Sequence, residues 1–484
     1  MNKFIVICIA LFFISGKQDK KESRTIESSR PKIHFNAMAP LHVMFYNDWS
    51  KMEEADWEVF GKQLDEGAKM GLDAISVDVW WGFAEGKGDN NFEWEYYHRI
   101  FREITERGLD LIPILSFHAF DPGPRSAFRA PVPPWIWKHL LEGTSTLSEI
   151  DLKYVSEDRG ENGEPLYSEE FVSLWADDLV MPQYREFMDA FILEFKDYAD
   201  QIQEINVSCG PSGELRYSSY SRHDGGAFPN RGRFQCYSQP ALLDYQDWLK
   251  NHYASIDELN NAWESAYTNY EEIEMPDDPE TMFSTGAYRK DPQALNFITW
   301  YNEALMKHGN RMIQEALEAF AGPDSIEIGF KIPGIHWRIA DPVMPRSAEI
   351  TCGLIDAESL DGTAAYQKAL SQVISDLPLQ SIILHFTCIE QGNAYEGSGP
   401  SDHYSRARDL VYEVGAAAQN MELRLKGENA GARGLYDDEG WDRMESAISD
   451  GGYVGVTILR LGDVTTQNPL GNQRYTQLIK KFKY

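Results

Sequence analysis

Positive charge is scarce in this sequence. Its 484 residues carry 76 Asp and Glu against 45 Lys and Arg, which gives a formal net charge of −31. A chain this acidic is repelled by the phosphate backbone of nucleic acids and by anionic membrane surfaces. We therefore expect no nucleic-acid partner. This net charge neither favours nor disfavours the binding of a neutral ligand.

Long hydrophobic runs are also missing. The apolar run Phe4–Ile14 is too short to cross a bilayer, follows Lys3 and precedes the small residues Ser15 and Gly16, as in an export signal. We predict a signal peptide at residues 1–16, a flexible polar leader at residues 17–35 and a secreted or periplasmic location. No later run predicts a transmembrane segment.

Cysteine is rare, with 5 residues in the whole chain. Cys8 lies inside the predicted signal, and the others are widely spaced with no CxxC pair, which argues against a zinc knuckle. A chain of this length needs no disulfide to fold. We predict buried free thiols at Cys209, Cys236, Cys352 and Cys388.

Short apolar runs that alternate with helix-like amphipathic segments dominate the chain. The predicted strands are Ala39–Phe45, Ala74–Val79, Asp110–Ser116, Ile202–Ser208, Ile326–Lys331, Ser381–Thr387, Met421–Lys426 and Tyr453–Arg460. The predicted helices include Trp57–Met70, Tyr96–Arg107, Tyr184–Tyr198, Leu295–Phe320 and Asp402–Gln419. Continuous apolar strands between helices indicate a parallel sheet covered on both faces. Eight such units predict an α/β fold, a (β/α)8 TIM barrel, with residues 36–484 as one domain and long loops at residues 117–183 and 210–292 on the active-site face.

Polar side chains follow seven of the predicted strands, where a barrel gathers its functional groups. They are Asp78, His118, Glu214, Lys331, His336, Thr387, Glu390, Glu428, Asn429 and Arg460. Carboxylates dominate this set, and no nucleophilic Ser or Cys triad and no GxxxxGK[ST] phosphate loop is present. Glycoside hydrolysis typically uses two carboxyl groups, one protonated and one ionised.

At these residues the sequence resembles the β-amylases, glycoside hydrolase family 14. The blocks that carry the resemblance are Val77–Gly82 (VDVWWG), Gly210–Tyr217 (GPSGELRY), Lys331–Trp337 (KIPGIHW), Phe386–Glu390 (FTCIE), Gly427–Ala430 (GENA) and Leu459–Leu461 (LRL). They occur in the family's order from about residue 36 to the end. Residues 38–41 and 234–263 look closer to the bacterial members than to the plant members.

The resemblance implies an inverting exo-hydrolase that releases β-maltose from the non-reducing ends of α-1,4-glucans such as starch. Carried over residue by residue, it makes Glu214 the general acid and Glu428 the general base. The residues expected to contact the sugar are Asp78, His118, Lys331, His336, Thr387, Asn429, Ala430 and Arg460. We expect no required cofactor, an α-glucan as the partner and a monomer.

Some positions depart from the family pattern. The family follows the histidine of the third strand with a mobile glycine-rich lid, whereas here the segment contains Pro122 and Pro124, with Ser126 at the position of the lid's Asp. Proline restricts φ, so we expect a stiffer lid and weaker starch hydrolysis. Gly431 replaces an apolar Leu after GENA, and Gln391 replaces a Met in the inner loop.

A calcium site is a weaker implication of the resemblance. Glu85, Asp89, Gln183 and Glu186 stand at positions similar to a calcium site of the bacterial members, and oxygen ligands of this kind suit Ca²⁺. Solvated surface carboxylates are the alternative reading of these residues in an acidic chain.

Two other functions remain open at this point. The chain could be a weak or inactive glucan- or maltose-binding protein that keeps the cleft but has lost the lid. It could also be a retaining barrel glycosidase that acts on another sugar. The separation of the two carboxyl groups distinguishes retention, at about 5–5.5 Å, from inversion, at about 6.5–9.5 Å.

Overall fold

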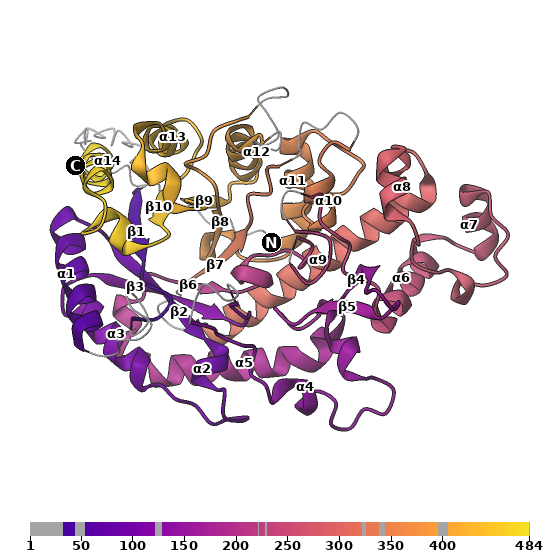
Figure 1. The fold of residues 1–484 in the computed structure, drawn as a ribbon, viewed down its shortest axis with the longest axis horizontal. Coiled ribbons are helices and arrows are strands. Elements are labelled where there is room, and N and C mark those ends of the chain that lie inside the picture. Colours follow the sequence, from indigo (N-terminus) through magenta and orange to yellow (C-terminus); the bar gives the residue numbers. More distant parts are fainter. Residues whose placement is uncertain are drawn as a thin grey trace, which may run out of the picture. The chain divides into compact units, whose positions relative to one another are not determined.

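Parallel strands close into a barrel in the computed structural model (Figure 1). The structure describes residues 32–43, 54–121, 128–220, 222–227, 230–321, 326–337, 344–394 and 405–483. In spatial order the barrel strands are β1 (His34–Met38), β10 (Gly455–Ile458), β9 (Arg424–Glu428), β8 (Ile382–Phe386), β7 (Glu327–Ile332), β6 (Glu204–Val207), β3 (Asp110–Ser116) and β2 (Ala74–Trp80). The predicted (β/α)8 barrel is thereby confirmed.

Helices surround the barrel and also occur in the long connections between its strands. They are α1 (Glu54–Met70), α2 (Trp81–Ala84), α3 (Glu95–Thr105), α4 (Ile136–His139), α5 (Asp177–Glu194), α6 (Gln239–His252), α7 (Ile256–Trp263), α8 (Pro279–Ser284), α9 (Pro292–Ala319), α10 (Ser347–Thr351), α11 (Gly362–Val373), α12 (Ala407–Asn420), α13 (Asp438–Ser449) and α14 (Pro469–Lys483). Helix α3 shows the local reason, because Tyr97, Ile100, Phe101 and Ile104 recur at helical spacing and are all buried. Every residue of β2 and of β8 is buried, as expected for strands that are covered on both faces.

The first strand lies earlier than predicted. The prediction of a strand at Ala39–Phe45 is wrong, because β1 spans His34–Met38 and pairs with β10 and β2. The described part of that run, residues 39–43, is mostly buried for a different reason. It follows the strand at the barrel mouth, where Leu41 lines a cavity and Val43 is buried.

Helix α5 also begins before its predicted start at Tyr184. It starts at Asp177 and includes Pro182. Proline disfavours the interior of a helix, so its position predicts a later start. A tertiary contact supports this early turn. The carboxylate of Asp177 lies 2.9 Å from Nδ1 of the buried His308 on α9.

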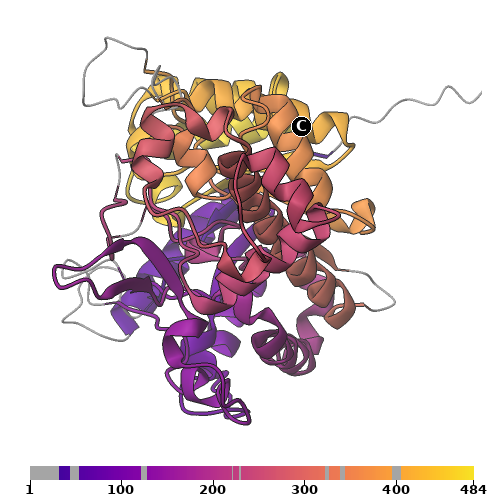
Figure 2. The ribbon, with the colours of Figure 1, turned by 90° about the vertical axis from the view of Figure 1, so that its right-hand side faces the viewer.

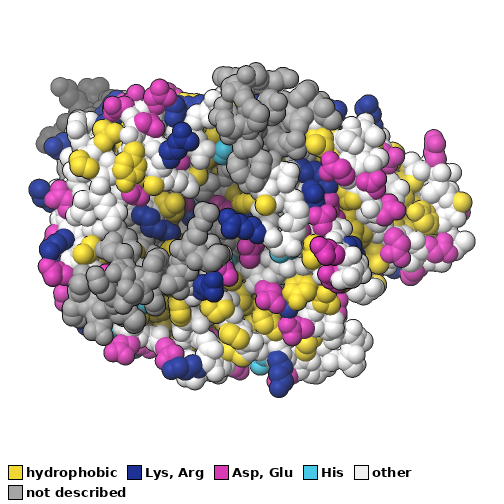
Figure 3. Space-filling model, in the orientation of Figure 1, with side chains coloured by type: hydrophobic (Ala, Val, Ile, Leu, Met, Phe, Trp, Pro, Cys, Tyr) yellow, Lys and Arg dark blue, Asp and Glu magenta, His cyan; other side chains and the backbone are white. Residues whose placement is uncertain are grey.

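The two long connections carry secondary structure of their own. The first contains an antiparallel hairpin of β4 (Tyr154–Arg159) and β5 (Pro165–Ser168), which is separate from the barrel sheet. The second contains α6, α7 and α8, which lie to the right of the barrel in Figure 1 and in front in Figure 2. Both charge signs are interspersed on the face shown in Figure 3, with acidic side chains gathered towards the α7 end.

Contacts between Cα atoms divide the chain into Met1–Lys32 and Ile33–Tyr484. Of the first unit only Lys32 lies in the described part, so the predicted signal and most of the predicted leader fall outside it. The cysteines of the second unit, Cys209, Cys236, Cys352 and Cys388, are buried free thiols, as predicted. Among the helices of the described ranges, none has the length and apolarity needed to span a bilayer.

Candidate active site

A cavity of about 170 Å³ opens at the carboxyl ends of the barrel strands. Five of the predicted site residues line it, each from a different strand or the loop after it: Asp78 (β2), His118 (after β3), Lys331 (β7), Glu428 (β9) and Arg460 (after β10). Ser212 and Gly213, which directly precede Glu214, line it as well. The closure of the barrel therefore brings residues far apart in sequence to one small space.

Glu428 and Lys331 form an ion pair in this cavity between Oε2 and Nζ. The Glu428 side chain is 3% exposed and that of Lys331 is 17% exposed. Burial disfavours the ammonium, but the carboxylates of Glu428, Glu214 and Asp78 outweigh it and raise the pKa of Lys331 above its ordinary value. Lys331 therefore keeps its positive charge beside the Glu428 carboxylate.

Glu214 is placed by a tight turn after β6. Gly213 has φ of +78°, and a Cβ there would also lie 3.3 Å from the His118 ring, so glycine suits both the turn and the close approach. Leu215 N–H donates to the Lys331 carbonyl at 2.7 Å and ties the turn to β7. The Glu214 side chain thus belongs to the same part of the barrel mouth as Lys331.

The carboxyl group of Glu214 is itself shielded, with 13% of its side chain exposed. Its Oε2 accepts a hydrogen bond from Nε of Arg216 at 3.0 Å. Burial raises the pKa of Glu214 above its ordinary value, Arg216 and Lys331 act in the opposite direction, and Glu428 adds to the rise. The two carboxyl groups therefore sit in different environments, since burial favours the protonated form of Glu214 whereas Glu428 is ion-paired with Lys331.

Asp78 and His118 line the same cavity. Ser116 Oγ donates to Asp78 Oδ1 at 3.0 Å, and burial raises the pKa of Asp78. The His118 Nδ1 lies 2.9 Å from Ser208 Oγ. Burial, Lys331 and Arg216 together lower the pKa of His118 to about 3, so its imidazole is neutral near pH 7.

A second cavity of about 580 Å³ contains the other predicted histidine. His336, Glu390, Gln391 and Gly431 are among the residues that line it. His336 Nδ1 lies 2.6 Å from Ser405 Oγ, and burial lowers the pKa of His336 to about 4. This imidazole is therefore also neutral near pH 7.

Glu390 joins this second cavity to the segment that follows Glu428. Its carboxylate oxygens accept the N–H groups of Ala430 at 3.1 Å and of Gly431 at 3.2 Å. Burial raises the pKa of Glu390 to about 7, although these N–H groups favour its ionised form. Glu390 thereby holds the backbone next to Glu428.

Thr387 and Asn429 make backbone contacts. Thr387 Oγ1 accepts the Gly334 N–H at 2.8 Å, and Asn429 Oδ1 accepts the Leu459 N–H at 2.8 Å. Thr387 therefore connects the segments that follow β8 and β7, and Asn429 connects those that follow β9 and β10. The structure places both residues at the barrel mouth, and their contact with sugar stays a prediction.

Two residues at this mouth were missed in the sequence analysis. Arg216 contacts Glu214, and a signal for it existed, since it stands two residues later in the quoted block. Trp80 lines the cavity and packs edge-on against His118, with ring centroids 5.2 Å apart. Its position in the run of buried strand residues gives no hint of a place in the cavity.

Three of the residues predicted for calcium lie near one another. Glu85 is buried, and its oxygens accept hydrogen bonds from Trp81 Nε1 at 2.7 Å and from Asn90 N–H at 2.7 Å. The charges of Asp89 and Glu186 add to the effect of burial, which raises the pKa of Glu85 to about 7. Across the described ranges, no group of three or more His, Cys, Asp or Glu has the arrangement of a metal site. The buried Gln183 Oε1 has no hydrogen-bond partner there, so an oxygen ligand is available, and calcium stays a prediction.

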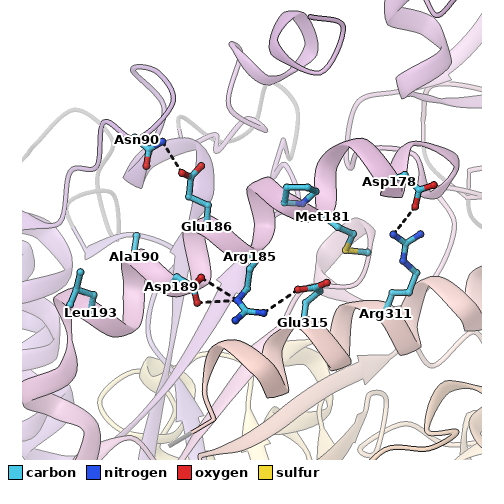
Figure 4. A pocket seen from close by; sticks show the side chains of 11 residues that line it. Asn90, Asp178, Met181, Arg185, Glu186, Asp189, Ala190, Leu193, Arg311 and Glu315 are labelled. Carbon is cyan, nitrogen blue, oxygen red and sulfur yellow. Dashed lines mark hydrogen bonds and ion pairs between the residues drawn. The ribbon is translucent and has the colours of Figure 1, made fainter. Parts of the chain in front are cut away.

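A larger cavity of about 840 Å³ lies on the helix layer between α5 and α9 (Figure 4). Its polar side chains are joined to one another, with Arg185 bonded to Asp189 and Glu315, and Arg311 to Asp178. None of the predicted catalytic or sugar-contacting residues lines it. The barrel mouth is therefore the candidate active site, although its cavity is smaller.

Comparison with known proteins shows the family to which this chain belongs. The sequence profile of glycosyl hydrolase family 14 matches residues 36–484. A β-amylase of Cytobacillus firmus is 33% identical over 85% of this chain and 81% of its own length, and a β-amylase of Bacillus cereus is 30% identical over 96% and 78%. The crystal structure of the catalytic domain of a Paenibacillus polymyxa β-amylase superposes with a TM-score of 0.78 at 30% identity, covering 93% of this chain and 99% of that domain. The chain belongs to glycosyl hydrolase family 14.

Proposed function

We propose that this protein hydrolyses α-1,4-glucans from their non-reducing ends and releases β-maltose by inversion. The observation that carries the proposal is the difference between the two carboxyl groups at the barrel mouth. Burial raises the pKa of Glu214, whereas Glu428 is ion-paired with Lys331. One group therefore suits proton donation and the other suits proton removal.

In the proposed reaction, Glu214 donates its proton to the glycosidic oxygen as the bond to the anomeric carbon breaks. Glu428 takes a proton from a water molecule, whose oxygen attacks the anomeric carbon from the opposite face. An α-linkage therefore gives a β-product. At the end, Glu214 is ionised and Glu428 is protonated, and exchange with solvent restores the starting state.

The remaining residues of the cavity suit a bound terminal sugar. Asp78 accepts a hydrogen bond from Ser116, and the neutral His118 carries one ring nitrogen beside Ser208. Their remaining acceptor and donor atoms are available for hydroxyl groups of glucose. We assign Asp78 and His118 to the outermost glucose, and Lys331 and Arg460 to deeper positions along the chain.

The test is incubation with soluble starch and with maltoheptaose, followed by identification of the products and of their anomeric form by proton NMR during early hydrolysis. We expect β-maltose as the first product, and loss of at least 10²–10⁴-fold in rate for Glu214→Gln and Glu428→Gln. α-Maltose as the first product would indicate a retaining enzyme. Binding of maltoheptaose without any hydrolysis would indicate a glucan-binding protein.

We also propose that the protein is exported and that residues 1–16 are removed. The support is the sequence pattern alone, since these residues lie outside the described part. Expression of the full chain in a bacterial host, followed by amino-terminal sequencing of the extracytoplasmic protein, tests this. Recovery of an uncleaved chain in the cytoplasm would contradict it.

A further inference from the structure

A cavity of about 810 Å³ lies between the loop that follows β3 and the β4–β5 hairpin. Phe120 lines it from this loop, Trp137 lines it from α4, and Tyr167 lines it from the hairpin. Figure 1 shows β4 and β5 outside the ring of barrel strands, and of the residues that line this cavity only Phe120 also lines the cavity at the barrel mouth. It contains none of the residues assigned above to catalysis or sugar contact.

A buried lysine holds the two aromatic rings of this cavity in place. Lys153, with 5% of its side chain exposed, places Nζ 4.6 Å from the centre of the Tyr167 ring and 5.4 Å from that of Trp137. Glu149 and Glu169 bind the same ammonium at 2.7 Å and 2.6 Å. The rings are therefore fixed before any ligand arrives, which lowers the entropy cost of binding.

The side chain of Tyr167 is exposed to solvent. Its relative exposure is 41%, which makes it one of the few large apolar side chains of the described surface that are open to solvent. An exposed aromatic ring that is held rigidly from behind is suited to stacking against a flat ligand face. The apolar CH face of a glucose ring is such a surface.

The charges around the cavity favour a neutral ligand. Three acidic residues line it, Asp121, Glu169 and Glu170, and they are offset by Arg129 and Arg222 together with Lys153 beneath the rings. Arg129 Nε bonds to Asp121 at 3.0 Å, and Lys153 bonds to Glu169. The carboxylates would repel an anion, and the guanidinium groups would repel a cation. Sugar hydroxyls can both donate hydrogen bonds to and accept them from these groups.

The cavity also adjoins the candidate active site. Phe120 lines both cavities, and its ring lies 6.1 Å from that of Trp80 at the barrel mouth. The shared wall is fixed by backbone bonds, from Phe120 N–H to Ala130 O at 2.7 Å and from Ala119 N–H to Glu170 O at 2.7 Å. A long glucan that is bound at the barrel mouth would therefore lie next to this cavity.

We propose that the cavity built on Trp137 and Tyr167 is a second carbohydrate site, which binds α-glucan segments by ring stacking next to the catalytic cleft. The inference rests on the proposed function for its choice of sugar. Its role is to hold polymeric substrate, and it does not take part in bond cleavage. The hydrolysis of short substrates that occupy only the barrel mouth should therefore not depend on this cavity.

The experiment measures maltoheptaose binding by isothermal titration calorimetry in a Glu214→Gln background, which prevents hydrolysis. We expect two sites per chain, of which Tyr167→Ala removes or weakens one by about tenfold or more. Tyr167→Phe keeps the ring and should keep both sites. Tyr436→Ala is the matched control, because Tyr436 is 54% exposed and lines none of the cavities described above.

Kinetics of the catalytically intact Tyr167→Ala variant provide the second measurement. We expect a several-fold higher KM for soluble starch and an unchanged kcat/KM for maltotetraose. One maltoheptaose site that is insensitive to Tyr167→Ala, or equal losses on starch and maltotetraose, would overturn the second site and leave the proposed hydrolysis intact. Absence of both maltoheptaose binding and hydrolysis would overturn the proposed function together with this inference.

Discussion

Lys331 Nζ contacts Glu428 Oε2 at the mouth of the barrel, and this ion pair joins β7 to β9 across the intervening β8. Both side chains are largely shielded from water, so the attraction between the charges is stronger than it would be on the surface. Lys331 also lies within the electrostatic reach of Glu214 and Asp78. One ammonium group therefore influences three carboxyl groups of the candidate site.

Replacing Lys331 by Met should reduce kcat on maltoheptaose by at least about 10²-fold. The variant leaves the Glu428 carboxylate shielded without its positive neighbour, so proton removal from water becomes harder. Lys307→Met, a change at an exposed lysine of α9, serves as the control and should keep the wild-type kcat. A wild-type kcat in Lys331→Met would contradict the role given to the pair.

Gly431→Leu tests the departure from the family pattern next to Glu428. A Cβ at Gly431 meets nothing within 4 Å, and its φ of −166° is ordinary extended backbone, so the leucine should fit with a change in unfolding free energy within about 0.5 kcal/mol. Because Gly431 lines the 580 Å³ cavity, the new apolar wall should lower KM for maltoheptaose. Steady-state kinetics and urea unfolding measure the two effects.

The control for this substitution is Gly434→Leu. A Cβ at Gly434 would lie 2.4 Å from Cγ of Glu390, so this leucine should destabilise the protein. If Gly431→Leu lowers stability as much as Gly434→Leu does, the space assigned beside Gly431 is not available.

Glu390 should make stability depend on pH. Its pKa rises from an ordinary 4.5 to about 7 on folding, so between these values the folded protein holds a proton that the unfolded chain has released. The free energy of unfolding therefore falls as pH rises through this window, by on the order of 3 kcal/mol. Glu390→Gln should remove this part of the slope. Urea unfolding at pH 5 and at pH 8 measures it, and Glu439→Gln, at an exposed carboxylate beside the same cavity, should leave the slope unchanged.

A buried ion pair lies inside the barrel and joins strands that are not adjacent in the sheet. Glu204 on β6 bonds to Lys426 Nζ on β9 at 2.5 Å and to His385 on β8. Burial opposes ionisation of Glu204, but Lys426 and His385 outweigh it and hold its pKa below the ordinary range. Glu204→Leu should cost about 3–5 kcal/mol of unfolding free energy, because it leaves the Lys426 charge buried without a partner.

The double variant Glu204→Leu/Lys426→Met removes both charges of this pair. It should recover much of the loss, and a double-mutant cycle by urea unfolding gives the coupling between the two residues. Additive losses would mean that the pair does not stabilise the fold.

Calcium binding is tested by thermal unfolding with CaCl₂ or EDTA. If Glu85, Asp89, Gln183 and Glu186 hold an ion, calcium at about 100 times its Kd stabilises the wild type by about 2.7 kcal/mol. Glu85→Gln and Glu186→Gln should abolish this response, whereas Glu106→Gln, an exposed carboxylate next to α3, should keep it. Equal melting temperatures in CaCl₂ and EDTA would exclude a bound ion that stabilises the fold.

Much of the architecture was predictable because burial on both faces leaves a local signature. The apolar runs at β2, β3 and β8 lie within about one residue of their predicted bounds. The approximate position of each polar residue at a strand end follows from the same signature. The first strand was misplaced, because an apolar run at the barrel mouth and a strand in the barrel wall have the same local composition.

The sequence by itself determined the fold class, the family blocks and the identity of the two candidate carboxylates, since each rests on residues close together in the chain. Only the tertiary structure decided which charges meet, as for Lys331 with Glu428, and that Trp137 and Tyr167 share one buried lysine. The physical reason is that hydrophobic periodicity encodes burial locally, whereas an ion pair or a shared cavity depends on barrel closure and strand register. Those bring together residues that no local pattern connects.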